Sequence, residues 1–131
     1  MAGTGPRGSA FNRTRQAQVA ARLAVAATHW SRFRGLMGCQ ASAFQRGDGL
    51  WIVPSRGVHT FAMNFPLDVI YLNAANFVVH LEENLKPWRL GRIHLQAHSV
   101  LELPVNTLRE TGTTIGDEIE IVSDLQEPRQ E

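Results

Sequence analysis

Turn-forming residues divide this chain into short β-rich runs, and that division limits the folds it can adopt. Proline, glycine and asparagine recur between apolar runs that are too short for long helices. Apolar alternation and β-branched residues predict strands over 19–25, 50–53, 58–63, 67–72, 77–81, 100–103 and 118–122. Short strands joined by turns are typical of barrels and sandwiches. We therefore expect a mainly β fold: a small antiparallel β-barrel or sandwich-like domain with one or two short helices.

Two short helices are predicted between these strands. Thr28 is placed to cap the first, in which Trp30, Phe33 and Met37 form one apolar face at spacings of three and four residues. Asn106 is placed to cap a second helix of a single turn. Both are accessories to a fold that the strands dominate.

The length and composition indicate one folded body with polar ends. At 131 residues, 44% hydrophobic and 19% charged, the chain is typical of a globular domain. We expect a flexible N-terminal tail over 1–17, a single β-rich domain over 18–123 and a flexible C-terminal tail over 124–131. A lone cysteine, Cys39, excludes an intrachain disulfide. No run approaches the ~18–20 apolar residues of a membrane span, and no signal peptide is evident, so we expect a cytoplasmic protein.

Charge is distributed unevenly along the chain. Residues 1–60 hold eight arginines and one acid, Asp48, whereas residues 61–131 hold five basic and eleven acidic residues. This asymmetry can mark a nucleic-acid surface, or the two halves can neutralise each other in the fold. No block of like charges is contiguous, so the sequence favours pairing between the halves and makes a nucleic-acid partner unlikely.

His59 is the titratable residue best suited to chemistry. On the predicted strand it shares a face with Phe61 and Met63. Two interpretations stay open: a structural histidine held by hydrogen bonds, or a site residue that binds a metal or acts as acid or base with Asp68 as partner. A simple hairpin would place His59 near Tyr71 rather than Asp68, which favours the structural interpretation.

The segment 86–92 interleaves three cations with one indole ring. Trp88 and Arg89 are suited to stack on a sugar or base and to hold a phosphate or carboxylate. The alternative is a loop pinned by a buried Trp88, with its arginines in solvent. The sequence favours that alternative because large aromatic residues usually serve packing.

Glu102 is a carboxylate within an apolar strand, between Leu101 and Leu103. In normal strand alternation it points outward into solvent. The other possibility is a buried acid that requires an arginine partner. The sequence leaves both possibilities open.

An ordered series of motifs along the chain resembles one known family. The motifs are Arg34-Gly35-Leu36-Met37, His59-Thr60-Phe61-Ala62-Met63, Phe65-Pro66-Leu67-Asp68-Val69-Ile70-Tyr71-Leu72, Val78-Val79, Pro87-Trp88-Arg89, Leu101-Glu102-Leu103-Pro104 and Gly116-Asp117. In this order they resemble the family called domain of unknown function 192 (uncharacterised protein family 0127). The resemblance implies a compact, mostly β domain found in bacteria and archaea, and it implies no activity.

One position departs from this family's pattern. Asn106 stands where the family usually has glycine, after the Leu-Glu-Leu-Pro run. Asparagine tolerates left-handed backbone better than most residues, so we expect the turn to be kept.

Three functional hypotheses follow. The first is a binding module that holds a small anionic or carbohydrate-like ligand, or a peptide, through His59, Phe61, Met63, Trp88 and Arg89. The second is a metal-assisted or acid–base enzyme using His59 and Asp68, with His59 as the candidate metal ligand. The third is a nucleic-acid contact through the arginine-rich first half. The sequence favours the binding module over the enzyme and predicts no cofactor or metal; the ligand and the oligomeric state stay open.

Overall fold

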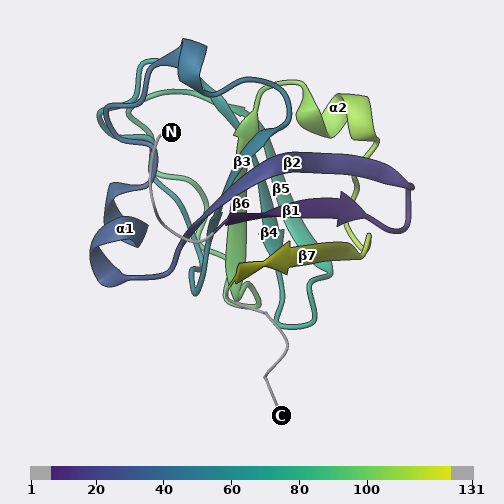
Figure 1. Ribbon diagram of the computed structural model, residues 1–131. Coiled ribbons are helices and arrows are strands. Elements are labelled where there is room, and N and C mark those ends of the chain that lie inside the picture. The colour runs from purple at the N-terminus through teal and green to yellow at the C-terminus, as the bar shows by residue number, and fades with distance from the viewer. Residues whose placement is uncertain (1–6, 125–131) are drawn as a thin grey trace.

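The computed structural model describes residues 7–124 and is dominated by one sheet (Figure 1). The strands are β1 (Arg7–Asn12), β2 (Ala17–Ala26), β3 (Asp48–Ile52), β4 (Leu67–Leu72), β5 (Val78–Leu85), β6 (Ser99–Pro104) and β7 (Ile119–Ser123). The helices are α1 (His29–Arg34), α2 (Thr107–Thr111) and the short 3-10 turn η1 (Ala41–Ala43). The seven strands form a sheet in the order β5-β4-β6-β3-β2-β1-β7. The expected mainly β, barrel-like fold with short helices is confirmed.

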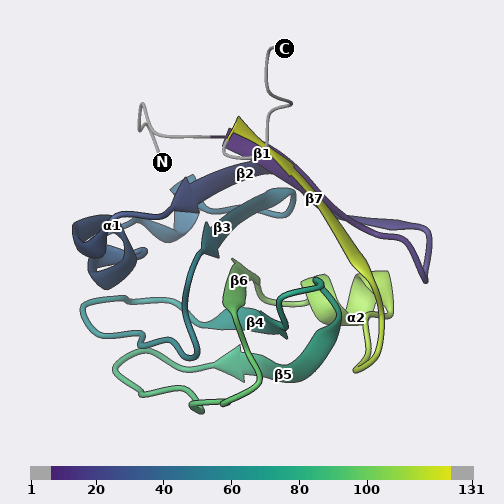
Figure 2. The same ribbon diagram turned by 90° about the horizontal axis from the view of Figure 1, so that it is seen from below.

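The sheet curls into an incomplete barrel (Figure 2). Its two outer strands approach each other at one end, where Phe77 and Glu118 form an isolated bridge. Two backbone hydrogen bonds of 2.8 Å reinforce this bridge, from Val78 N to the Asp117 carbonyl and from Gly116 N to the Val78 carbonyl. The pairing is antiparallel except between β2 and β3. That parallel pair arises because a long crossover, residues 27–47, joins the two strands instead of a tight hairpin.

The sheet buries both of its faces. One core cluster draws residues from all seven strands and fills the inside of the curl; it includes Leu23, Leu101 and Ile119. The second cluster lies on the other face of the central strands and includes Val69 and Val100. Residues from the connecting segments cover this outer face: Leu36, Phe44, Met63, Phe65 and Ala97. Strand β6, in the interior of the sheet, is therefore covered on both faces.

Most of the expected N-terminal tail is structured, which corrects the prediction for residues 1–17. Residues 7–12 form β1, which pairs with β2 and β7. The segment is hard to recognise in the sequence because its buried positions hold small or polar residues such as Ala10 and Asn12. Gly8 is required there, since a Cβ would lie 1.9 Å from the Val122 carbonyl oxygen. Apart from Asp124, the expected C-terminal tail lies outside the described residues, as do residues 1–6.

The predicted strand over 58–63 is wrong. This stretch is an irregular loop whose one ladder contact is the bridge between His59 and Leu90. Thr60 N donates to the Arg89 carbonyl at 2.9 Å, and Ala62 has a positive φ of 60°. The alternation of apolar residues resembled a strand, but these bonds to a neighbouring loop replace a sheet ladder.

The first helix forms as expected but is exposed. Thr28 makes a capping box with Ser31, and the helix ends at Gly35 rather than Gly38. Trp30 is 68% exposed and Phe33 is 59% exposed, so the expected apolar face is not buried. No residue of α1 is buried, and within residues 7–124 no helix is long and apolar enough to span a membrane.

The second helix confirms one expectation and corrects another. Asn106 adopts the left-handed conformation at φ 75°, as expected of a residue standing in place of glycine. Its side chain makes no capping hydrogen bond. Asp68 of β4 caps the helix instead, because its Oδ2 accepts a hydrogen bond from Leu108 N at 3.0 Å.

Candidate functional site

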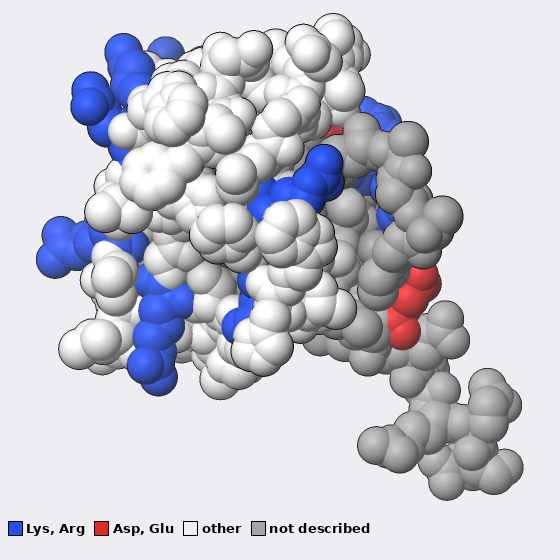
Figure 3. Space-filling model, turned by 90° about the vertical axis from the view of Figure 1, so that its left-hand side faces the viewer, with Lys and Arg blue, Asp and Glu red and all other residues white. Residues whose placement is uncertain are grey.

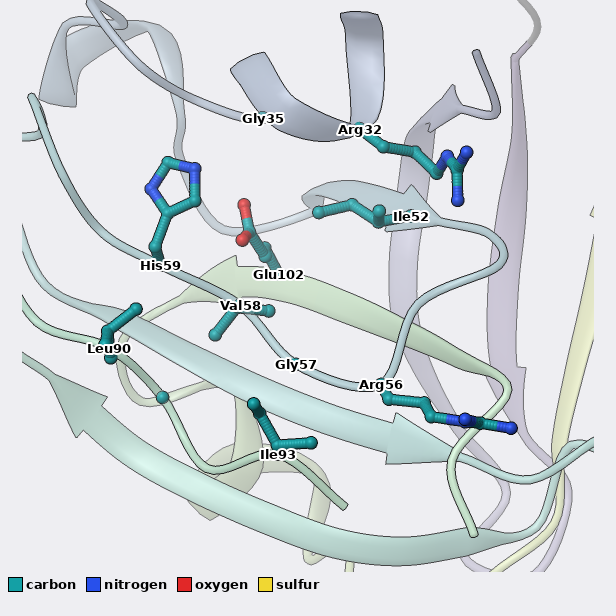
Figure 4. A pocket seen from close by; sticks show the side chains of 11 residues that line it. Arg32, Gly35, Ile52, Arg56, Gly57, Val58, His59, Leu90, Ile93 and Glu102 are labelled. Carbon is teal, nitrogen blue, oxygen red and sulfur yellow. The ribbon is translucent and has the colours of Figure 1, made fainter. Parts of the chain in front are cut away.

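A cavity of about 350 Å³ lies between the outer face of the sheet and the segments that cover it (Figure 4). Ile52 of β3 and Glu102 of β6 come from the sheet, and α1 and two loops supply the other walls. The lining residues are Arg32, Gly35, Ile52, Arg56, Gly57, Val58, His59, Leu90, Gly91, Ile93 and Glu102. This volume is within the range of small-ligand sites, which are largely apolar with a few polar groups.

Glu102 is the buried acid of this cavity. It is 2% exposed, lies opposite Leu50 and Val69 in the sheet, and its Oε1 has no hydrogen-bond partner. Its carboxyl group points from β6 towards Gly35 and His59 (Figure 4). Burial raises the pKa of Glu102 to about 8, so the carboxyl group is protonated at neutral pH. A neutral acid in a mostly apolar cavity is a hydrogen-bond donor without an acceptor.

The end of α1 forms the wall facing Glu102. Gly35 has φ 49° and ψ −125°, a conformation that favours glycine, and it caps the C-terminal end of the helix. A Cβ on Gly35 would lie 3.8 Å from the Glu102 Oε1 atom. The backbone of residue 35 thus approaches the acid closely and leaves the space beside it open.

A tight loop forms the opposite wall. Gly91 N donates to the Val58 carbonyl at 2.9 Å, and Arg92 N donates to the Glu82 carboxylate at 2.9 Å. A Cβ on Gly91 would lie 2.7 Å from a methyl group of Val58 and 3.1 Å from the Tyr71 hydroxyl. These contacts hold the loop against the sheet and define the cavity without any ligand.

His59 lines the cavity and is held by two hydrogen bonds. Its Nδ1 accepts from Phe61 N at 3.2 Å, so Nε2 carries the proton and donates to the Phe33 carbonyl at 2.8 Å. The ring therefore joins its own loop to the last turn of α1. The structural interpretation of His59 accounts for both nitrogens, while the side of its ring remains part of the cavity wall.

A row of aromatic rings runs across the surface beside the cavity. The His59 ring lies between Phe33, with centroids 5.7 Å apart, and Phe61, with centroids 5.1 Å apart. Trp30 extends the row at one end and Trp88 at the other, with centroids 6.0 and 6.2 Å from their neighbours. Trp88 is 65% exposed, which corrects the expectation of a buried indole. The sequence predicts a binding site that includes His59, Phe61 and Trp88, and the structure brings these three rings together.

The other residues of the predicted sites, Met63, Arg89 and Asp68, are not part of this aromatic row. Met63 is buried in the outer core and contributes packing. Arg89 is exposed, and its backbone N and carbonyl bond to Thr60. Asp68 is 1% exposed and its two carboxylate oxygens accept from the backbone N–H groups of Asn84 and Leu108. Within residues 7–124, His59 and Asp68 bond to different partners and no hydrogen bond joins them, so the predicted acid–base pair has no geometric support.

Three of the eight arginines in residues 1–60 form ion pairs with acids of the second half. Arg15 pairs with Asp117 at 3.1 Å and Arg46 with Glu110 at 2.8 Å, while Arg13 lies 3.7 Å from Glu120. The expected pairing between the halves therefore holds for these three arginines, whereas Arg22 pairs with Asp48 of its own half, and Arg32, Arg34 and Arg56 form no ion pair among the described residues. Within residues 7–124, no group of three or more His, Cys, Asp or Glu side chains is placed to hold a metal ion.

The sequence does not assign Glu102 to a site. It shows an acid inside an apolar strand, and normal strand alternation explains such an acid as facing solvent. That explanation fails because the connecting segments cover the outer face of the sheet and exclude solvent.

Comparison with known proteins places this geometry in a family. The family model DUF192, described as "Uncharacterized ACR", matches residues 10–121. A UPF0127 protein of Thermococcus sibiricus is 32% identical over 115 residues, which cover 84% of this chain and 72% of that protein.

Solved structures support the same fold. A protein of unknown function from Novosphingobium aromaticivorans matches with a TM-score of 0.74 at 18% identity, covering 87% of this chain and 83% of the other. A Sinorhizobium meliloti protein, provisionally described as a transcription regulator, matches with a TM-score of 0.72 at 20% identity, covering 88% and 92%. The family match over most of the chain is decisive: the chain belongs to the DUF192 (UPF0127) family.

Proposed function

We propose that this protein is a binding module whose cavity takes a small ligand with an apolar body, an anionic group and a hydrogen-bond acceptor. The observation that carries the proposal is the buried, unpartnered carboxyl group of Glu102, which faces the cavity. A buried polar group without a partner costs free energy, and a ligand oxygen that accepts its proton removes that cost. The cavity already exists without a ligand, which lowers the cost of binding.

The other walls define the rest of the ligand. Ile52, Val58 and Leu90 offer apolar contacts to its body. Arg32 and Arg56 edge the cavity and form no ion pair within residues 7–124, so they favour an anionic group. The predicted preference for a small anionic ligand is retained on these grounds.

The test uses three matched probes: 4-methoxybenzoate, 4-ethylbenzoate, which lacks the acceptor oxygen, and 4-methoxybenzamide, which lacks the charge. Binding is measured by calorimetry and NMR at pH 6.5. We expect 4-methoxybenzoate to bind at least ~10-fold more tightly than either analogue, since a hydrogen bond or charge contact contributes about 1–3 kcal/mol. Failure of all three probes to shift cavity resonances at millimolar concentration would overturn the proposal.

Variants of Glu102 test whether its carboxyl group donates the hydrogen bond to the ligand. Glu102→Gln keeps a neutral donor, so it retains binding, whereas Glu102→Leu is expected to lose at least ~10-fold in affinity for 4-methoxybenzoate. In the wild type, affinity falls as pH rises above about 8 because Glu102 loses the donated proton. Equal affinity of wild type and Glu102→Leu, with both proteins folded, contradicts a role for this acid.

A further inference from the structure

Exposed large apolar side chains gather on one face of the molecule. Three segments build it: 28–44, 53–66 and 86–98; we call it the apolar face. Seven of the exposed large apolar side chains belong to these segments: Trp30, Phe33, Phe61, Trp88, Leu90, Ile93 and Leu95. Elsewhere in residues 7–124, the large exposed apolar side chains are Phe77, Ile115 and Val122. Contiguous exposed apolar surface of this kind marks contact sites.

Contacts between the three segments show that they form one surface. The ring row from Trp30 to Trp88 passes through all three. Backbone bonds join the second and third segments, from Thr60 N to the Arg89 carbonyl and from His94 N to the Arg56 carbonyl, both at 2.9 Å. Figure 3 looks onto the side of the molecule that carries α1: its surface is mostly uncharged, with several basic groups, and the acidic groups in view lie towards one edge.

The same face is basic and has no acidic residue. The three segments contain six cations and neither aspartate nor glutamate: Arg32, Arg34, Arg56, Lys86, Arg89 and Arg92. Among the described residues, none of the six forms an ion pair. The described arginines that do form ion pairs, among them Arg15, Arg22 and Arg46, lie outside the apolar face. The partner of this face therefore carries negative charge.

The exposed aliphatic side chains discriminate between anionic partners. Leu90 is 74% exposed and Leu95 is 78% exposed, and both lie among the cations. A nucleic acid would neutralise the cations and stack on the rings, but it offers no apolar cover for leucine. A second copy of this chain would bring six cations against six cations, which costs free energy. An anionic lipid surface supplies both negative headgroups and an apolar layer beneath them.

We propose that the apolar face docks on anionic phospholipid bilayers, with Trp30, Trp88 and Leu90 entering the headgroup region and the six cations contacting lipid phosphates. Tryptophan prefers this interface because its ring is apolar and its N–H is polar. Arginine side chains reach outward from such a surface towards phosphate. The docking does not require a ligand in the cavity, although Arg32, Arg56 and Leu90 belong both to the apolar face and to the lining of the cavity.

Vesicle sedimentation tests the proposal with the full chain. Large unilamellar vesicles of phosphatidylcholine alone are compared with vesicles containing 30% phosphatidylglycerol, at 100 mM salt. We expect at least ~10-fold tighter binding to the anionic vesicles and weaker binding in 500 mM salt. The emission of Trp30 and Trp88 shifts to the blue on binding, because both are exposed in the free protein, whereas Trp51 is already buried. Absence of binding to anionic vesicles overturns the proposal.

Paired variants locate the contact. Trp30→Ala with Leu90→Ser, and separately Arg34→Gln with Arg89→Gln, are each expected to weaken binding by at least ~10-fold. The matched control combines Val122→Ser with Arg109→Gln, an exposed apolar residue and an exposed cation outside the apolar face. Circular dichroism confirms that each variant is folded. Equal loss in control and face variants contradicts the proposal, as does tighter binding of a single-stranded 20-mer of thymidine than of the vesicles.

Discussion

At the scale of single residues, Glu102 is the unusual choice in this chain. It occupies the centre of a sheet, between Leu50 and Val69, where an aliphatic side chain would pack without penalty. No arginine compensates it, since the neighbouring Arg32 donates to the Pro54 carbonyl instead. The acid is neutralised by taking up a proton, and its pKa of about 8 follows from burial alone. Such a perturbed group in a cavity is a marker of function.

Glu102 also makes stability depend on pH. Its pKa is raised from 4.5 to about 8 in the folded state, so the folded chain holds a proton that the unfolded chain releases. The free energy of unfolding therefore falls as pH rises between about 4.5 and 8, by on the order of 4 kcal/mol. We expect Glu102→Gln to remove this decline and to be more stable than the wild type at pH 8.5. Urea unfolding of both proteins from pH 5 to 8.5 measures the difference; parallel pH profiles would contradict the assignment.

At the scale of elements, hydrogen bonds from neighbouring segments hold both helices in place. α1 has no buried residue, so its capping box and the bond from His59 Nε2 to the Phe33 carbonyl hold it in place. α2 begins after Asn106, which makes no side-chain cap, and its first turn is held by Asp68 from β4. Short helices are marginal by themselves, and here tertiary hydrogen bonds fix their positions.

Asp68 is thus expected to act in stability rather than in chemistry. Asp68→Ala leaves the N–H groups of Asn84 and Leu108 without their acceptor. Each unsatisfied group lowers the free energy of unfolding by at most about 1–3 kcal/mol. We expect a lower urea midpoint and faster amide hydrogen exchange at 107–111, with affinity for 4-methoxybenzoate within twofold of wild type. Loss of ligand affinity in a variant that keeps wild-type stability would instead support the predicted partnership with His59.

At the scale of the whole molecule, a small polar network joins the end of β1 to the turn that precedes β7. Asn12 of β1 donates to Asp117 at 3.0 Å, Arg15 donates to the same carboxylate at 3.1 Å, and Thr114 N adds a third bond at 3.0 Å. Burial raises the pKa of Asp117, but these hydrogen bonds outweigh burial and hold the pKa below its usual value. The network joins segments about a hundred positions apart, close to the bridge that begins the closure of the barrel.

Removing this network is expected to affect the entire fold. Asp117→Ala leaves the buried Asn12 amide without one of its acceptors and should lower the free energy of unfolding by roughly 2–4 kcal/mol. Because the pKa of Asp117 is depressed, its contribution is present above about pH 4 and is lost as pH falls below that value. Thermal unfolding at pH 7 and pH 3 tests this: the variant and wild type should differ much less at pH 3. An equal difference at both pH values would contradict the assignment.

The sequence by itself determined the strands that carry their own apolar pattern, such as 67–72 and 100–103, and the left-handed turn at Asn106. These features are local, because side-chain alternation and backbone preference act over a few residues. The sequence does not predict β1, because the buried positions of this strand are small or polar. It predicts a strand over 58–63 because apolar residues alternate there, although the segment forms a loop. The charge counts of the two halves predict ion pairs between them, but they do not predict which arginine pairs with which acid.

Only the tertiary structure decided the candidate site. His59, Phe61 and Trp88 could be singled out from the sequence as aromatic or titratable residues, but their union with α1 depends on contacts between distant segments. In the sequence, Glu102 resembles an ordinary solvent-facing acid. It is buried because the connecting segments pack on the outer face of the sheet. Burial is a property of what packs against a residue, and no local pattern encodes the position of a distant loop. The sequence therefore determined which side chains were present, and packing decided which of them line a cavity and which remain exposed.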